Sequence, residues 1–100
     1  MSLDHIDPLL AAPKRLAALG VLNGAREVEF AFIRDHLDLS DSDLSKQMRA
    51  LSDVGYVRVK KTGKAASRKT WFRITPAGRR ALQAHVQALN ELVLESLPPP

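Results

Sequence analysis

The hydrophobic positions of this chain recur mostly at helical spacing and predict four helices. The first opens at Pro13, which suits an initial helical turn, and ends at the Asn-Gly pair 23–24. Its apolar face carries Leu16, Leu19 and Leu22. A short second helix is marked by Phe30, Phe32, Ile33 and Leu37. Residues 27–30 alternate polar and apolar over too short a stretch to decide between a strand and the start of that helix.

The third predicted helix spans about residues 42–54 and has two unlike faces. Its apolar face carries Leu44, Met48, Leu51 and Val54. The opposite face is short, polar or basic, with Ser42, Ser45, Lys46, Arg49 and Asp53. N-cap residues cluster at 40–42, and Gly55 is a natural C-terminal stop. The polar face is therefore available to contact a partner molecule.

A hairpin and a long helix complete the chain. Residues 56–60 alternate apolar and basic, and residues 70–74 are β-branched and aromatic, which predicts two paired strands. Their connection, about 61–69, is too long for a two-residue turn and is expected to be a flexible basic loop. Thr75 and Pro76 open a helix predicted over 76–97, and the prolines at 98–100 form a frayed tail.

Length and charge narrow the possible partners. One hundred residues, 45% hydrophobic and 26% charged, predict one globular domain over 1–100, with a core at about 13–75. The net charge is only +4, but between Lys46 and Arg80 eleven basic residues face one acid, Asp53. One-signed clustering is the electrostatic footprint of a surface that meets a polyanion.

Several classes of protein are not expected. The chain has no cysteine, and its three histidines stand at no metal-ligand spacing, so no metal or cofactor is predicted. His85 is most simply a packed residue. No nucleotide-binding or hydrolase motif is present, which argues against an enzyme. No basic leader or apolar run of roughly 18 residues appears, so a cytoplasmic location without membrane insertion is predicted.

The order of elements predicts a mainly α fold with a small β-hairpin (α+β), arranged as a winged helix-turn-helix. From Leu37 the chain reads LDLSDSDLSKQMRALSDVGYVRVKKTGKAASRKTWFRITPAGRRAL. This stretch resembles the core of MarR- and ArsR-type winged-helix regulators. The matching positions are Leu44, Ser45, Met48, Leu51, Gly55, Tyr56, Val57, Lys61, Ile74, Thr75, Gly78 and Arg79. The resemblance implies a transcriptional regulator.

A recognition helix fits the major groove of B-DNA, with its polar side chains against base edges. The candidate readers on the third helix are Ser42, Asp43, Ser45, Lys46, Gln47 and Arg49. Three of them have another interpretation. Asp43 favours the helix dipole as a first-turn acid, Ser42 is a possible cap, and Gln47 lies at the boundary of the polar face.

The basic connection of the hairpin, about 60–69, is expected to contact phosphate or a minor groove. Its candidate residues are Lys60, Lys61, Lys64, Arg68 and Lys69. The alternative is a solvated turn without a partner. Arg58 and Arg73 lie on the strands and are weaker candidates, and Trp71 is expected to pack partly or to form an interface.

The last helix carries a long apolar stripe, and one small domain does not readily bury all of it. We expect it to form a homodimer contact that places two recognition helices on successive groove turns about 34 Å apart. The candidate dimer residues are Leu82, Val86, Leu89, Leu92 and Val93. The alternative is packing entirely within its own chain.

Together these features predict a homodimeric, sequence-specific regulator that binds double-stranded DNA. The alternative is a protein–protein interaction module that uses the winged-helix scaffold without reading DNA. A small-molecule effector is a third possibility, but no polar cluster in the sequence supports it.

Overall fold

A computed structural model describes residues 3–95, 98 and 99 of the chain. Its elements are α1 (Pro13–Asn23), β1 (Val28–Glu29), α2 (Phe30–His36), α3 (Asp41–Asp53), β2 (Val57–Thr62), the 3₁₀ turn η1 (Ala65–Ser67), β3 (Lys69–Ile74) and α4 (Pro76–Glu95). The predicted α+β class and winged-helix order are confirmed. The predicted end of the last helix, residues 96–97, lies outside the described residues.

Two expectations about α3 are corrected. The helix begins at Asp41, and its N-cap is Ser40, whose side chain accepts a hydrogen bond from the Asp43 backbone N–H at 3.1 Å. Ser42 is therefore not the cap. Val54, expected on the apolar face, follows the end of the helix and is 50% exposed, because the chain turns away through Gly55 with φ of +78°.

The strands form one antiparallel sheet in the order β1-β3-β2. Val28 pairs with Phe72, so the undecided residues before α2 include a short edge strand. β2 and β3 are longer than predicted and pair from Val57↔Ile74 out to Thr62↔Lys69. We call this hairpin, residues 57–74, the wing, and its end, residues 63–68, the wing tip.

The wing tip is an ordered turn rather than the flexible loop that the sequence suggested. It contains η1, in which the Ser67 hydroxyl donates to the Lys64 carbonyl at 2.8 Å. The backbone turns at Gly63 with φ of +76°, and a Cβ there would lie 2.3 Å from the Ser67 carbonyl oxygen. Local hydrogen bonds and glycine therefore shorten the unpaired connection.

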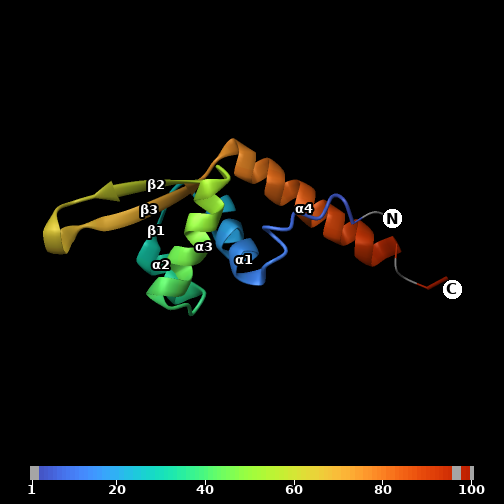
Figure 1. Cartoon of the computed structure of the whole chain (residues 1–100), viewed down its shortest axis with the longest axis horizontal. Coiled ribbons are helices and arrows are strands. Elements are labelled where there is room, and N and C mark those ends of the chain that lie inside the picture. Colours follow the sequence, from blue (N-terminus) through green and yellow to red (C-terminus); the bar gives the residue numbers. More distant parts are fainter. Residues whose placement is uncertain (1–2, 96–97, 100) are drawn as a thin grey trace.

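The core lies where the first three helices pack on one face of the sheet. Its fully buried side chains include Leu19, Leu22, Ile33, Leu44 and Leu51. The wing and α4 project from this centre in opposite directions (Figure 1), which makes the molecule 61 Å long but only 25 by 20 Å across. The first three helices thus hold two projections, the wing and α4, on opposite sides of the core.

The segment before α1 lies along α4 and is tied to it through a buried histidine (Figure 1). His85 is 1% exposed, and its Nδ1 accepts a hydrogen bond from the Asp7 backbone N–H at 3.1 Å. The Asp7 carboxylate in turn accepts from the Tyr56 hydroxyl at 2.7 Å, which raises the pKa of Tyr56 to about 12. His85 is thus a packed residue, as predicted.

The start of α4 is fixed against the rest of the chain at two points. Arg79 donates to the backbone carbonyl of Asn23 and so satisfies an open carbonyl at the end of α1. Gly78 sits so close to the turn after α3 that an added Cβ would lie 2.2 Å from the Tyr56 carbonyl oxygen. α4 therefore leaves the core in a set direction.

Candidate nucleic-acid interface

The exposed face of α3 carries four of the predicted reader residues. Ser42, Ser45, Lys46 and Arg49 are all exposed. They point outward because the opposite face of the helix, with Leu44, Met48 and Leu51, is buried in the core. Two hydroxyls and two cations on one open helical face match the donors and acceptors that base edges and phosphates require.

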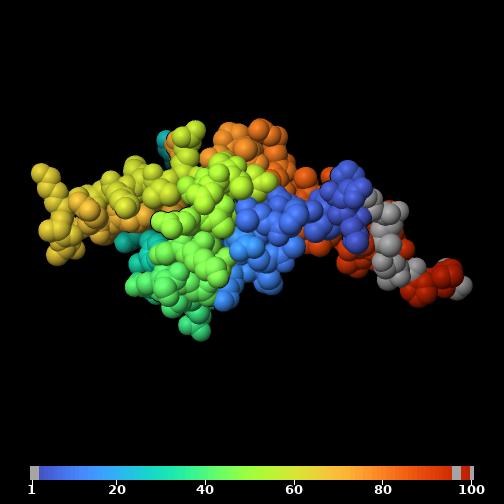
Figure 2. Space-filling model, in the orientation of Figure 1, coloured from blue at the N-terminus to red at the C-terminus, as the bar shows by residue number. Residues whose placement is uncertain are grey.

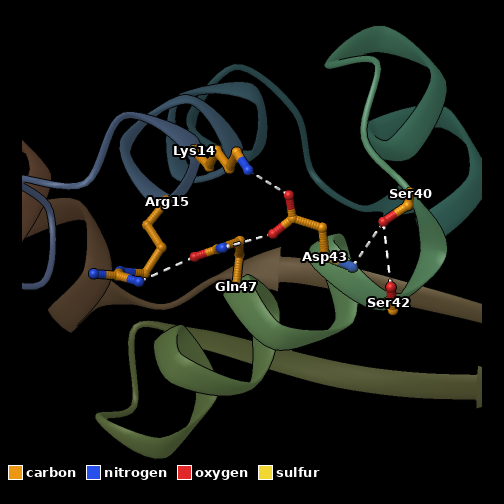
Figure 3. A network of polar contacts seen from close by, with 6 residues as sticks. All are labelled: Lys14, Arg15, Ser40, Ser42, Asp43 and Gln47. Atoms are coloured by element: carbon orange, nitrogen blue, oxygen red, sulfur yellow. Dashed lines mark hydrogen bonds and ion pairs between the residues drawn. The ribbon is translucent and has the colours of Figure 1, made fainter.

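Gln47, a predicted reader, is turned into the protein instead. It is 6% exposed, donates to the Asp43 carboxylate at 2.9 Å and accepts from the Arg15 guanidinium at 3.0 Å. Figure 3 shows this chain of contacts between α1 and α3. We correct the expectation for Gln47, because both ends of its amide are occupied and lie away from the exposed face.

Asp43 belongs to the same network. Its other carboxylate oxygen accepts from Lys14 at the start of α1 (Figure 3). The hydrogen bond from Lys14, and after it the one from Gln47, hold the pKa of Asp43 below its usual value. A carboxylate committed to two partners contributes to placing α3 rather than to reading a base.

Sequence reasoning missed Lys14 and Arg15 as partners of α3. Arg15 also donates to the Leu9 carbonyl at 2.7 Å, so it joins the segment before α1 to α3. Lys14 is 29 residues from Asp43, and Arg15 is 32 residues from Gln47. No periodicity within one helix reveals contacts over such separations.

A second ion-pair group ties α2 to the first turn of α3. Arg34 donates to Asp35 and to Asp41, each at 2.9 Å. These hydrogen bonds, led by the one with Asp35, raise the pKa of Arg34 and lower that of Asp35. The pairs are exposed, so they orient side chains more than they stabilise the fold.

The register of the wing divides its predicted cations between two faces. Lys61 pairs with Thr70 on the inner face, which turns toward α3. Lys60, opposite Trp71, and Lys69, opposite Thr62, lie on the outer face. Lys60 is moreover paired with Glu27 at 2.8 Å. The five cations predicted as one group therefore do not form one surface.

The wing tip holds the two remaining cations, Lys64 and Arg68. Both are exposed, and neither has an acidic partner among the residues that the structure describes. Between α3 and the inner face of the wing lies an open hollow of about 380 Å³. Its lining includes Ser45, Arg49 and Lys61. The hollow thus carries two cations, Arg49 and Lys61, and one acid, Asp53, and the wing tip adds two further exposed cations.

The predicted dimer residues of α4 are also divided. Leu82 is buried in the core of its own chain, so we correct its assignment to an exposed contact. Leu89 and Leu92 are half-buried, whereas Val86 is 41% and Val93 62% exposed. Leu94, which sequence reasoning did not single out, is exposed as well. Beside Val86, an apolar hollow of about 570 Å³ lies between α1 and α4.

The structure offers no other obvious chemistry in its described part. Residues 3–95, 98 and 99 contain no group of three or more histidine, aspartate or glutamate side chains able to hold a metal ion. Among the same residues, no helix has the length and apolar character needed to span a bilayer.

A three-helix core, an open third helix and a basic hairpin define the winged-helix class of DNA-binding proteins. Residues 14–93 match the family model described as "Winged helix DNA-binding domain", and the chain belongs to this family. The uncharacterized protein MJ0432 of Methanocaldococcus jannaschii is 30% identical over 78 residues, which cover 78% of this chain and 85% of that protein.

Solved structures of transcriptional regulators share the fold of this chain. A transcriptional regulator homologue from Pyrococcus horikoshii OT3 superposes with a TM-score of 0.81 at 27% identity, covering 89% of both chains. A MarR-family regulator from Porphyromonas gingivalis W83 gives 0.69 at 17% identity, covering 89% of this chain and 85% of the other. MepR of S. aureus, solved with DNA, gives 0.69 at 16% identity, covering 85% and 73%. The last two likenesses concern the fold alone.

Proposed function

We propose that this protein is a transcriptional regulator, not an enzyme, that binds double-stranded DNA as a homodimer. We propose that it acts in the cytoplasm. The observation that carries the proposal is the cationic surface formed by α3 and the wing tip, where Lys46, Arg49, Lys64 and Arg68 are exposed without acidic partners among the described residues. Such a surface attracts a phosphate backbone.

In this proposal α3 lies in the major groove and supplies the sequence preference. Arg49 and Lys46 reach guanine edges or phosphates, and Ser42 and Ser45 donate or accept at the groove floor or backbone. Asp43 and Gln47 hold the helix against α1 without touching a base. A rigidly held reader loses little freedom on binding, which favours specificity.

The wing supplies affinity. Lys64 and Arg68 at the tip, with Lys61 on the inner face, engage phosphates or a minor groove beside the reading site. Lys60 and Lys69 lie on the outer face, and we assign them at most a long-range attraction.

The salt dependence of binding to random duplex DNA tests whether the wing-tip cations, rather than the outer-face lysines, contact phosphates. Fluorescence anisotropy should show affinity falling steeply with salt. The logarithm of the binding constant should fall linearly with the logarithm of the salt concentration, by about 0.9 for each phosphate contact. A Lys64→Gln, Arg68→Gln double variant should lower the slope by about two contacts' worth. A Lys60→Gln, Lys69→Gln double variant, which removes the same two charges from the outer face, serves as the matched control and should change the slope little. A flat slope in the wild type would contradict DNA binding and favour a protein partner.

The homodimer is proposed from the exposed apolar residues of α4. Val86 and Val93 are two turns apart on a helix that projects from the core, and the hollow between α1 and α4 lies next to Val86. A second copy packed here would bury these residues and set two α3 helices on successive major grooves.

Sedimentation velocity tests the dimer separately from DNA binding. The wild-type chain should sediment as a dimer, and a Val86→Lys, Val93→Lys variant should sediment as a folded monomer. Glu91→Lys adds positive charge to the same helix at an exposed position and should stay dimeric. A wild-type chain that remains monomeric at high concentration would refute the proposed contact.

A further inference from the structure

Two arginines face one another on the outer face of the wing. Arg58 of β2 and Arg73 of β3 are direct cross-strand partners, and both are exposed. Side chains in such a pair start from Cβ atoms about 5 Å apart, and like charges placed there destabilise a sheet. Neither guanidinium has a hydrogen bond or ion pair with any residue that the structure describes. Neither arginine is therefore paired with a carboxylate in the described part of the chain.

The arginine pair lines a small hollow that has one aromatic wall. The hollow measures about 310 Å³ and is bounded by Arg58, Arg73, Lys60, Trp71 and Glu27 with the strand residues between them. Lys60 is neutralised by Glu27, and the half-buried Trp71 indole is oriented by a hydrogen bond from its Nε1 to the Thr62 hydroxyl at 3.1 Å. Two free positive charges and a fixed ring therefore share one site.

We propose that this hollow binds a small phosphomonoester. A guanidinium group can bind phosphate oxygens in a bidentate manner, and a phosphomonoester carries about −1.5 to −2 charges at pH 7, which matches the two arginines. A carboxylate monoanion would leave one arginine uncompensated. The apolar part of the ester lies against Trp71, and the phosphate separates the two guanidinium groups.

Two features favour a small anion over a second stretch of DNA. Glu29 of β1 pairs with Trp71, so its side chain lies on the same face as the arginines, and Glu27 borders the hollow. Because Glu27 is paired with Lys60, the Glu29 carboxylate is the charge that repels a long phosphate backbone laid across the sheet. The outer face is also the side of the sheet turned away from α3, so one duplex on α3 does not cover it.

Trp71 is the only tryptophan of the chain, so its fluorescence reports on this site directly. The wild-type protein is titrated at constant ionic strength with phenyl phosphate, inorganic phosphate and phenol. We expect a saturable change with phenyl phosphate, binding of inorganic phosphate at least tenfold weaker, and no saturable change with phenol. Equal responses to phenyl phosphate and phenol, or no saturable response at all, would overturn the proposal.

Variants separate the site from general charge attraction. Arg58→Gln and Arg73→Gln should each raise the Kd for phenyl phosphate at least tenfold, whereas Lys61→Gln, which removes a cation from the opposite face of β2, should change it less than twofold. Arg58→Gln should melt no lower than the wild type, because it removes a like-charge contact, so lost binding will not reflect unfolding. An equal rise in the Kd for phenyl phosphate in Lys61→Gln would contradict the proposed site.

Duplex binding, measured in parallel, decides between this site and an extended DNA surface. Arg58→Gln should leave the salt slope for random duplex unchanged. If it lowers that slope as much as neutralising Lys64 and Arg68 does, the outer face belongs to the DNA surface and the phosphomonoester site is wrong. The phosphomonoester proposal does not rest on DNA binding. Absence of DNA binding would therefore not contradict the phosphomonoester site, and absence of phosphomonoester binding would not contradict DNA binding.

Discussion

Helix α3 and the wing present positive charge by different means. α3 is held by a buried apolar face and by the network that joins it to α1 through Lys14, Arg15, Asp43 and Gln47. Beyond the Lys60–Trp71 pair, the wing is held by its own strand ladder. Its tip stands apart from the rest of the molecule (Figure 2), and residues 63–68 are all exposed. This difference fits the proposed roles: α3, which we propose selects the sequence, is a fixed element, whereas the wing tip, which we propose contacts the DNA backbone, tolerates movement.

The largest expected difference between the two regions is in stability. Leu51 of α3 is fully buried, so Leu51→Ala should lower the free energy of unfolding by about 2–5 kcal/mol. Val59 of the wing is 45% exposed, and Val59→Ala should cost less than about 1 kcal/mol. Urea denaturation measures both. Equal losses would show that the wing is part of the cooperative core.

Removing the Gln47 side chain tests the network between α1 and α3. Gln47→Ala leaves the Arg15 and Asp43 groups that it bridged without that partner, and should cost about 1–3 kcal/mol. We expect affinity for a selected specific sequence to fall more than affinity for random duplex, because the reader helix is less well placed. An equal fall for both DNAs would argue against a positioning role.

The Tyr56–Asp7 hydrogen bond makes the stability of the anchored region depend on pH. The pKa of Tyr56 rises from 10.0 to about 12 in the folded protein. Its contribution to stability is therefore fully present below pH 10 and is lost as the pH rises toward 12. Tyr56→Phe should lose about 1 kcal/mol at pH 8 and show a smaller decline in stability between pH 10 and 12. Parallel curves for the two proteins would contradict this assignment.

The smallest expected effect on stability is at the wing tip. Replacing Lys64 and Arg68 with Gln should change the free energy of unfolding by less than about 0.5 kcal/mol, because both side chains are exposed without acidic partners in the described part of the chain. The same variant should weaken binding to random duplex DNA by anisotropy. A large loss of stability would mean that the tip has a structural role.

The sequence alone determined the helices, the hairpin and the winged-helix order. Leu44, Met48 and Leu51 recur at helical spacing, and residues 56–60 alternate as a strand does, so local periodicity carried this information. The exposed readers Ser42, Ser45, Lys46 and Arg49 followed from the same periodicity, because the face opposite a buried stripe is solvated.

Only the tertiary structure decided which polar groups remain free. Gln47 lies at the edge of the polar face, and its burial depends on Arg15, 32 residues away. The division of the wing cations depends on strand register, since a shift of one residue would exchange Lys60 and Lys61 between the two faces. Leu82 is buried rather than left open to a second copy because it packs into the core of its own chain. Contacts between residues far apart in the chain determined each of these outcomes, and no local pattern encodes them.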